Sequence, residues 1–324
     1  MLGLGLSLLT GGSLRPYYAV VAAAFKDRVE ADGGTVESMS CLKADLKVLN
    51  TIKPPAYSGL LNDYSGAAAA YSLRLLDTSY TGDAIVVRRA SDSATQAIGF
   101  VNNELDTATL ESFCSGTDGF VTTWYDQSGN GNNATQTTAS AQPQIVSSGS
   151  TILDGGKPSI LINATSVSSS VRLQTQEFSL TQPFTMFGVA TAYDVSDNTQ
   201  QLTDNRDSTV SAGLAIQVNS NAYAIGAGGL LVYKNPAING SAIHYGLFNG
   251  SNSNEGYNGS TANSNAGYNG ANGITIGGAR GIGSPVSSSY GWVGSIYELI
   301  VYDVNQSTNR TGIETNINEY YSIY

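Results

Sequence analysis

The sequence predicts a mainly β protein: an antiparallel β-sandwich with a short N-terminal helical segment and a C-terminal helix. Of the 324 residues, 37 are Gly and 8 are Pro, and charged residues make up only 12%. From about Ala67, short apolar or alternating runs are separated by clusters of Gly, Asn, Asp and Ser. Such runs, at this spacing, are typical of sandwich strands joined by tight turns. Helical periodicity is confined to the two ends of the chain.

The first helical segment is predicted to be a hairpin that docks on a partner. Residues 18–30 and 40–53 each place apolar side chains on one helical face, and Pro54-Pro55 ends the second run. We therefore expect a docking segment over 1–55, a linker over 56–66 and the sandwich over 67–324. The predicted docking residues are Val21, Phe25, Val29, Leu42 and Leu46.

The sandwich is expected to contain roughly ten to fourteen strands. They are predicted within residues 70–76, 84–90, 119–126, 158–163, 184–193, 213–218, 223–233, 244–248, 274–279 and 294–303. Residues 307–324 follow as a helix that Ser307 or Thr308 can cap, with Ile313 and Ile317 on its apolar side.

The tract from Asn249 to Gly273 is rich in Asn, Gly and Ser, and GYNG occurs in it twice, at Gly256 and Gly267. Asn-Gly pairs favour the type I′ turn because both central residues need positive φ angles. A β-hairpin therefore explains the repeat, and a dedicated ligand loop is the alternative.

Charge and composition exclude several classes of function. The net charge of −10 argues against nucleic-acid binding, and no apolar run is long enough to span a membrane. The two cysteines, Cys41 and Cys114, are expected to be free buried thiols. The N-terminal apolar run lacks a basic region before it, so we expect a protein made in the cytoplasm without a signal peptide.

Catalysis by histidine or zinc is disfavoured. His244 is the only histidine, it lies in an apolar run, and no G-x-S-x-G motif accompanies it. One His and two separated Cys cannot supply a zinc site. Carboxylates remain, and glycoside hydrolysis needs two of them. The candidates in strand or loop settings are Asp126, Asp204, Asp207, Glu255, Glu298 and Asp303.

The block WYDQSGNGNN, which begins at Trp124, is predicted to be a turn that ends a strand. The Asp126 side chain can accept hydrogen bonds from the next amides, while Gly129 and Gly131 supply positive φ angles. A calcium site is the alternative, because Asp126, Asn130 and Asn132 offer oxygens on one loop. No other cofactor is expected.

The first half of the sandwich resembles the catalytic domain of family 54 α-L-arabinofuranosidases, which is a concanavalin-like β-sandwich. The resemblance covers roughly residues 67–165, and its motifs are Tyr71-Ser72 with Arg74, the run from Arg88 to Asp92, Phe113-Cys114, and the block from Tyr125 to Asn132. It implies a concanavalin-like jelly roll. In that family a Glu nucleophile follows an adjacent Cys pair, and an Asp is the acid/base. This chain has no adjacent Cys pair and no Glu in 213–218, so no catalytic residue is carried over.

The second half resembles the ending of laminin-G or concanavalin-like lectins, and residues 21–50 resemble a segment at the start of bacteriophage virion-associated proteins. Together these resemblances imply a non-enzymatic structural component of a tailed phage particle, located in the virion on the capsid or tail. Its partners would be other virion proteins, a surface glycan and further copies of itself. The predicted sugar-contacting residues are Trp292, Tyr257, Tyr268 and Tyr290.

The alternative function is an arabinofuranosidase-like glycoside hydrolase that acts on a host surface polysaccharide. Two carboxylates about 5–5.5 Å apart in an aromatic-lined groove would favour it. A bacterial surface adhesin is disfavoured because no leader is apparent.

Overall fold

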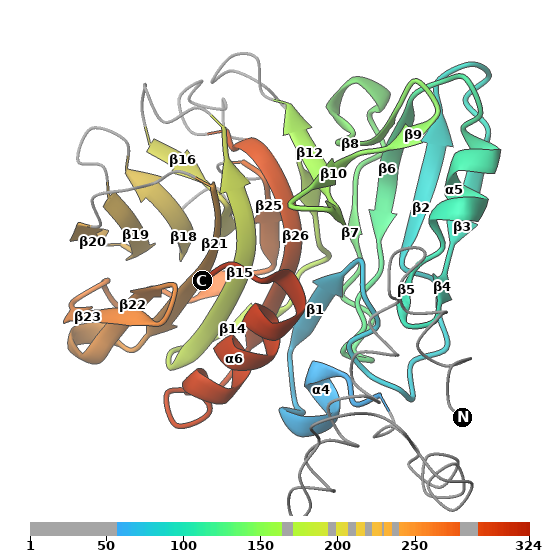
Figure 1. Cartoon of the computed structure of the whole chain (residues 1–324). Helices are drawn as coiled ribbons and strands as arrows, with labels where there is room; N and C mark the ends of the chain where they lie inside the picture. Colours follow the sequence, from blue (N-terminus) through green and yellow to red (C-terminus); the bar gives the residue numbers. More distant parts are fainter. Residues whose placement is uncertain are drawn as a thin grey trace, which may run out of the picture. The chain divides into compact units, whose positions relative to one another are not determined.

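The computed structural model describes residues 57–163, 171–193, 199–206, 212–217, 222–228, 230–234, 240–278 and 291–324. Figure 1 shows these ranges in colour. The described part is mainly β with antiparallel sheets, as predicted. The predicted docking residues Val21, Phe25, Val29, Leu42 and Leu46 lie outside the described residues.

The first half of the sandwich supplies twelve strands, several of them only two residues long. They are β1 (Ala69–Ser72), β2 (Ile85–Arg89), β3 (Thr95–Ile98), β4 (Phe100–Val101), β5 (Glu104–Leu105), β6 (Gly119–Trp124), β7 (Ala134–Thr135), β8 (Gln144–Ser147), β9 (Ser150–Thr151), β10 (Leu153–Asp154), β11 (Lys157–Pro158) and β12 (Ile160–Asn163).

The second half contains the longest strands. Its strands are β13 (Leu173–Gln174), β14 (Ser179–Leu180), β15 (Phe184–Ala192), β16 (Thr199–Gln201), β17 (Thr203–Asn205), β18 (Ala212–Gln217), β19 (Ala222–Ala227), β20 (Leu230–Lys234), β21 (Gly240–Phe248), β22 (Ser253–Tyr257), β23 (Ser260–Ser264), β24 (Ala271–Asn272), β25 (Ile274–Ile276) and β26 (Val293–Tyr302).

The helices of the described part are short. They are α4 (Leu60–Asp63), α5 (Thr107–Phe113), α6 (Arg310–Tyr321) and the 3-10 turns η1 (Ala139–Ala141) and η3 (Gly250–Asn252). Asp106 caps α5, because its side chain accepts a hydrogen bond of 3.0 Å from the Thr109 amide. No described helix is long and apolar enough to cross a membrane.

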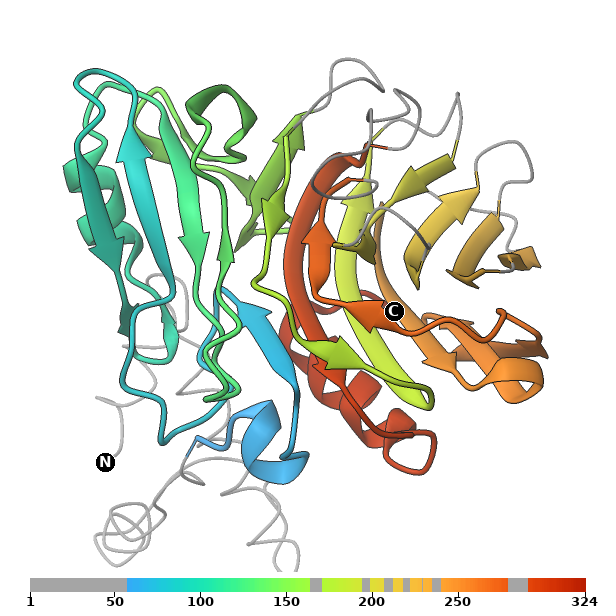
Figure 2. The same ribbon diagram turned by 180° about the vertical axis from the view of Figure 1, so that it is seen from behind.

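The centre of the main sheet is β26, which pairs with β1, β12 and β15. From β15 the sheet continues through β21 and β22 to β23, and these strands curve around the second half of the molecule (Figure 1). A separate four-stranded sheet, in the order β16-β18-β19-β20, lies against their inner face (Figure 2). Contact between the two sheets is close: a Cβ on Gly246 of β21 would lie 2.8 Å from side-chain atoms of both Leu214 and Ile225.

The long central strands are buried on both faces. Their inner residues, such as Met186 and Leu299, belong to the main core between the sheets. The outer face is covered by α4 and α6, where Ile313 and Ile317 of α6 are fully buried. Burial of a side chain of this size contributes about 1.5–3 kcal/mol, so Ile313 and Ile317 help to hold the twelve-residue helix on the sheet.

Several details differ from the sequence predictions. The described residues contain 26 strands, more than expected, because many pairings span only two residues. Residues 223–233 form two strands, β19 and β20, since Gly228 turns the chain with a φ of +87°. Helix α4 lies within the expected linker, and α5 was not predicted.

Other predictions are confirmed. In the Asn-rich tract, Asn258 and Gly259 both have positive φ and join β22 to β23 as a two-residue turn. The second GYNG copy, at Gly267, is not a hairpin turn, since the strand that follows it, β24, pairs with β14. Helix α6 lies within the predicted range 307–324, although its N-cap is Asn309 instead of Ser307 or Thr308. Cys114 is a free buried thiol.

Candidate functional site

An aromatic cluster lies on the inner face of β21 and β22. The ring of His244 is 4.7 Å from that of Tyr223, 6.4 Å from that of Tyr257 and 6.0 Å from that of Trp292, measured between centroids. Tyr223 and Tyr257 stack at 4.0 Å. Each of the four side chains is at most 7% exposed, so the cluster is closed to solvent in this structure.

Strand alternation brings a carboxyl group to the same face as the aromatic cluster. His244 pairs with Tyr257, and Gly246 pairs with Glu255 in the next register position. Residues two apart on a strand point to the same side of the sheet, so Glu255 shares the inner face with Tyr257.

The pKa of the Glu255 carboxyl in this half of the sandwich is strongly shifted. Glu255 is 1% exposed, and neither of its oxygens has a hydrogen-bond partner at good geometry. Burial raises the pKa of the Glu255 carboxyl to about 8, and the backbone of Ile225, which is placed to donate to it, acts in the opposite direction. The carboxyl therefore retains its proton at neutral pH, as a general acid must.

Two further groups complete the site. The Trp292 side chain is fully buried and its indole N–H has no hydrogen-bond partner. Burial lowers the pKa of His244 to about 3, so the imidazole is neutral at physiological pH. A protonated carboxyl, an indole donor and uncharged rings are groups that can contact a sugar ring, and in this structure all of them are buried.

The predicted sugar-contacting residues are separated by the fold. Trp292 and Tyr257 meet in the aromatic cluster, whereas Tyr268 is 72% exposed and lies beside Gly250. Tyr290 lies outside the described residues. Sequence reasoning missed Tyr223, and it assigned His244 no role beyond structure. The available sequence signal for this cluster was the Asn258-Gly259 turn, because it fixes where β22 ends and so places Tyr257 at the end of that strand, opposite His244 of β21.

The other carboxylate candidates have structural environments. Glu298 is fully buried and its oxygens accept hydrogen bonds of 2.8 Å and 2.9 Å from Arg74 Nε and Nη2. Asp204 is fully buried and accepts a hydrogen bond of 3.2 Å from the amide of Ala212. Asp303 is exposed, and Asp207 lies outside the described residues.

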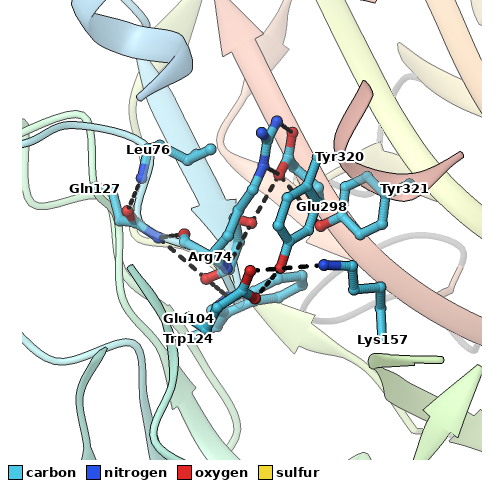
Figure 3. Close-up of polar contacts among 10 residues, drawn as sticks. Arg74, Leu76, Glu104, Trp124, Gln127, Lys157, Glu298, Tyr320 and Tyr321 are labelled. Carbon is cyan, nitrogen blue, oxygen red and sulfur yellow. Dashed lines mark hydrogen bonds and ion pairs between the residues drawn. The ribbon is translucent and has the colours of Figure 1, made fainter. Parts of the chain in front are cut away.

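The Arg74–Glu298 pair is the centre of a network that ties α6 to the sheet (Figure 3). Tyr321 donates a hydrogen bond of 3.3 Å to Glu298, and Tyr320 donates one to Glu104. Lys157 lies 3.6 Å from the same Glu104 carboxylate. The network is buried around Arg74, which is 4% exposed, and it links β1 and β26 to the C-terminal end of α6.

Asp126 organises the turn that follows Trp124. One carboxylate oxygen accepts hydrogen bonds from the amides of Ala70 (2.8 Å) and Ser128 (2.9 Å). The other accepts from the Ser128 hydroxyl (2.8 Å) and the Asn132 amide (2.9 Å). The side-chain amides of Asn130 and Asn132 both donate to the Ala68 carbonyl.

This arrangement is that of a hydrogen-bonded turn. Calcium binding by Asp126, Asn130 and Asn132 stays a prediction. Within the described ranges, no group of three or more His, Cys, Asp or Glu side chains could hold a metal ion.

Three surface hollows of the described part of the chain bear on the choice of site. One, of about 470 Å³, is lined by residues of β2, β3 and α5. A second, of about 380 Å³, is lined by Asn side chains from the hairpin β22–β23 and its surroundings. The third holds one carboxylate, Asp154. None of these three hollows carries the pair of carboxylates that the alternative function called for.

Comparison with known proteins links the first half of the sandwich to one family. Residues 63–167 match the family described as "Alpha-L-arabinofuranosidase B, catalytic". An alpha-L-arabinofuranosidase of Hypocrea jecorina is 43% identical over 70 residues, which are 21% of this chain and 14% of that protein. A probable alpha-L-arabinofuranosidase B of Aspergillus flavus is 42% identical over 71 residues, with the same two shares. The match thus spans a small part of these relatives.

The similarity in fold extends further. A solved arabinofuranosidase complexed with arabinofuranosyl-alpha-1,2-xylobiose aligns with a TM-score of 0.54 and 18% identity, over 78% of this chain and 62% of that chain. A family 54 α-L-arabinofuranosidase soaked with a cyclic sulfate inhibitor aligns with a TM-score of 0.55 over the same shares. At this identity the likeness shows the fold, which is shared beyond the matched 105 residues.

These findings correct the leading prediction from the sequence. The prediction of a structural component of a phage particle, located in the virion, is wrong, because residues 63–167 match an arabinofuranosidase catalytic family and the relatives described above are arabinofuranosidases of Hypocrea and Aspergillus. The resemblance of residues 67–165 to family 54 catalytic domains is confirmed. The resemblance of residues 21–50 to phage proteins has no support.

Proposed function

We propose that this protein is a glycoside hydrolase of the α-L-arabinofuranosidase type, which removes arabinofuranosyl groups from a substituted polysaccharide. The observation that carries the proposal is the match of residues 63–167 to the catalytic domain of that family. The shared fold supports it over most of the described chain. The aromatic cluster on the inner face, with its protonated carboxyl, supplies groups that such a reaction needs.

Hydrolysis of a glycosidic bond requires an acid that protonates the leaving oxygen while the bond from that oxygen to the anomeric carbon breaks. Water then supplies the hydroxyl group of the released sugar. We assign the acid role to Glu255, because its pKa of about 8 keeps the proton available at neutral pH. No second carboxylate is assigned, because Asp204 of the same half is fully buried and its carboxylate accepts hydrogen bonds from the amides of Asn205 and Ala212.

The test is release of nitrophenol from 4-nitrophenyl α-L-arabinofuranoside by the purified full chain. Removal of a general acid lowers the rate by about 10²–10⁴-fold, so Glu255→Gln should lose activity to that extent. The rate should also fall as pH rises above about 8, since Glu255 then loses its proton.

Glu319→Gln, an exposed change on α6, is the matched control and should leave the rate unchanged. Wild-type protein that releases no nitrophenol above the buffer rate, at any pH from 4 to 9, would contradict the proposed function. Full activity of Glu255→Gln would show that Glu255 is not the acid, and it would leave the proposed function itself intact.

A further inference from the structure

The polar hollow on the opposite face of β21 and β22 is not used by the proposed reaction. It has a volume of about 380 Å³ and is built from β21, η3, the hairpin β22–β23 and the segment that leads into α6. Its principal polar side chains are Asn249, Asn252, Asn254, Asn263, Asn305 and Arg310. We refer to it as the Asn groove.

Strand alternation separates the Asn groove from the aromatic cluster. Tyr245 and Asn254 line the groove, whereas their strand neighbours His244 and Glu255 point to the inner face. The two sites therefore lie on opposite sides of the same two strands, and a ligand in one does not contact the other.

The groove is held in shape by its own contacts. Asn254 donates a hydrogen bond to Asn263 across β22 and β23, and the turn Asn258-Gly259 fixes their register. Arg310 donates hydrogen bonds to Glu314 (3.0 Å) and to the Gly259 carbonyl (2.6 Å), which joins the start of α6 to the hairpin. Its guanidinium also lies 5.1 Å from the ring centre of Tyr245. These contacts place the wall of the groove on rigid strands instead of a free loop.

The chemistry of the lining favours a neutral, hydroxyl-rich ligand. Each Asn amide carries both donors and acceptors, so neighbouring amides can bind adjacent sugar hydroxyls, which also donate and accept. Arg310 is the only charged side chain in the lining, and the Glu314 carboxylate pairs with it at 2.9 Å. The exposed lining offers little apolar surface, because Leu247 and Tyr245 are buried beneath the amides. This lining does not suit an apolar or strongly anionic ligand.

From these observations we infer that the Asn groove is a second carbohydrate site, which binds an uncharged stretch of the polysaccharide chain away from the reacting bond. The inference depends on the proposed function only for the choice of polysaccharide. It assigns a role to the Asn-rich tract, whose hairpin displays the amides on one face.

The test is binding of the full-length protein to soluble arabinoxylan, measured by affinity electrophoresis, with the double variant Asn252→Ala/Asn263→Ala. Both residues are exposed, so the variant should fold normally. Loss of two sugar hydrogen bonds should weaken binding about tenfold. Hydrolysis of 4-nitrophenyl α-L-arabinofuranoside should be unchanged, because that small substrate does not reach the groove.

Ser251→Ala/Ser260→Ala is the matched control, since both serines are exposed beside the groove without lining it, and this variant should bind as wild type. Equal binding by the Asn variant and wild type would overturn the inference, as would preferential binding of polygalacturonate. The protein could also bind arabinoxylan through the Asn residues and yet show no hydrolase activity. That result would support the carbohydrate site in the Asn groove and contradict the proposed function.

Discussion

Buried polar groups are treated differently in the two halves of the sandwich. In the first half, Arg74, Asp126 and Gln127 each make several hydrogen bonds; Gln127, for example, donates to two carbonyls and accepts from the Leu76 amide. In the second half, Glu255 and Trp292 are equally buried and carry polar atoms without partners. In the described first half, only the Thr151 hydroxyl is in this state. Unpaired buried groups cost stability, and each calls for an explanation such as a ligand or a water that pairs with it. Under the proposed function, the half that matches the catalytic family in sequence is the scaffold, and the proposed acid lies in the other half.

The largest effect should come from breaking the scaffold at Arg74. Arg74→Met leaves the Glu298 carboxylate buried without its partner, and loss of one member of a buried pair costs about 3–5 kcal/mol. Urea unfolding would measure this change. The matched control is Arg89→Met, because the Arg89–Asp92 pair is 34% and 48% exposed and should contribute less than about 1 kcal/mol. Equal losses of unfolding free energy in the two variants would mean that burial of an ion pair does not change how much it contributes to stability.

Substitution of Glu255 should raise the free energy of unfolding at high pH, whereas Arg74→Met lowers it. Between its ordinary pKa of 4.5 and the folded value of about 8, the folded carboxyl holds a proton that the unfolded chain has lost. Stability therefore falls as pH rises through this window, by about 1.4 kcal/mol for each unit of pKa shift at most. Glu255→Gln removes this dependence, so the variant should be about 2–4 kcal/mol more stable than wild type at pH 9 and similar to it near pH 4.

Thermal unfolding of wild type and Glu255→Gln across pH 4–9 would measure the difference. A variant that is less stable than wild type at pH 9 would show that Glu255 is paired and charged in the fold. If Glu255→Gln also loses hydrolase activity, then the unfolding free energy that it gains at pH 9 equals the stability that the wild type gives up to keep a carboxyl group buried in the site.

The smallest effect is expected at Asp126. Asp126→Asn retains one acceptor oxygen but replaces the other with a donor that faces the Ser128 hydroxyl and the Asn132 amide. We expect a loss of about 1–3 kcal/mol in unfolding free energy, in the range for charge-assisted hydrogen bonds. Because four donors already occupy the carboxylate, millimolar calcium should leave the wild-type unfolding midpoint unchanged. A midpoint that rises with calcium, and does so only when Asp126 is intact, would establish the calcium site instead.

The elements that were predicted correctly are those determined by their own residues, without contacts from distant parts of the chain. The helix α6 follows from Ile313 and Ile317 at helical spacing, and the turn at Asn258-Gly259 follows from residues that tolerate positive φ. The division of 223–233 at Gly228 was missed because an apolar run does not show where a chain reverses. The aromatic cluster was missed for a similar reason: Tyr223, His244 and Trp292 come together only through sheet packing, which has no local signal.

The order in which β26 and its neighbours occur along the chain affects how the protein can be made. Strand β26, which ends at Tyr302, forms hydrogen bonds with β1, β12 and β15, all of which precede it. At about 5–20 residues per second, a ribosome completes β26 roughly 12–46 s after β1. Until then the edges of β1 and β12 that will pair with it are open, and open edges invite pairing with other chains. The main sheet therefore cannot close until β26 has been made, and the yield of native protein depends on how well the nascent chain is protected during that interval.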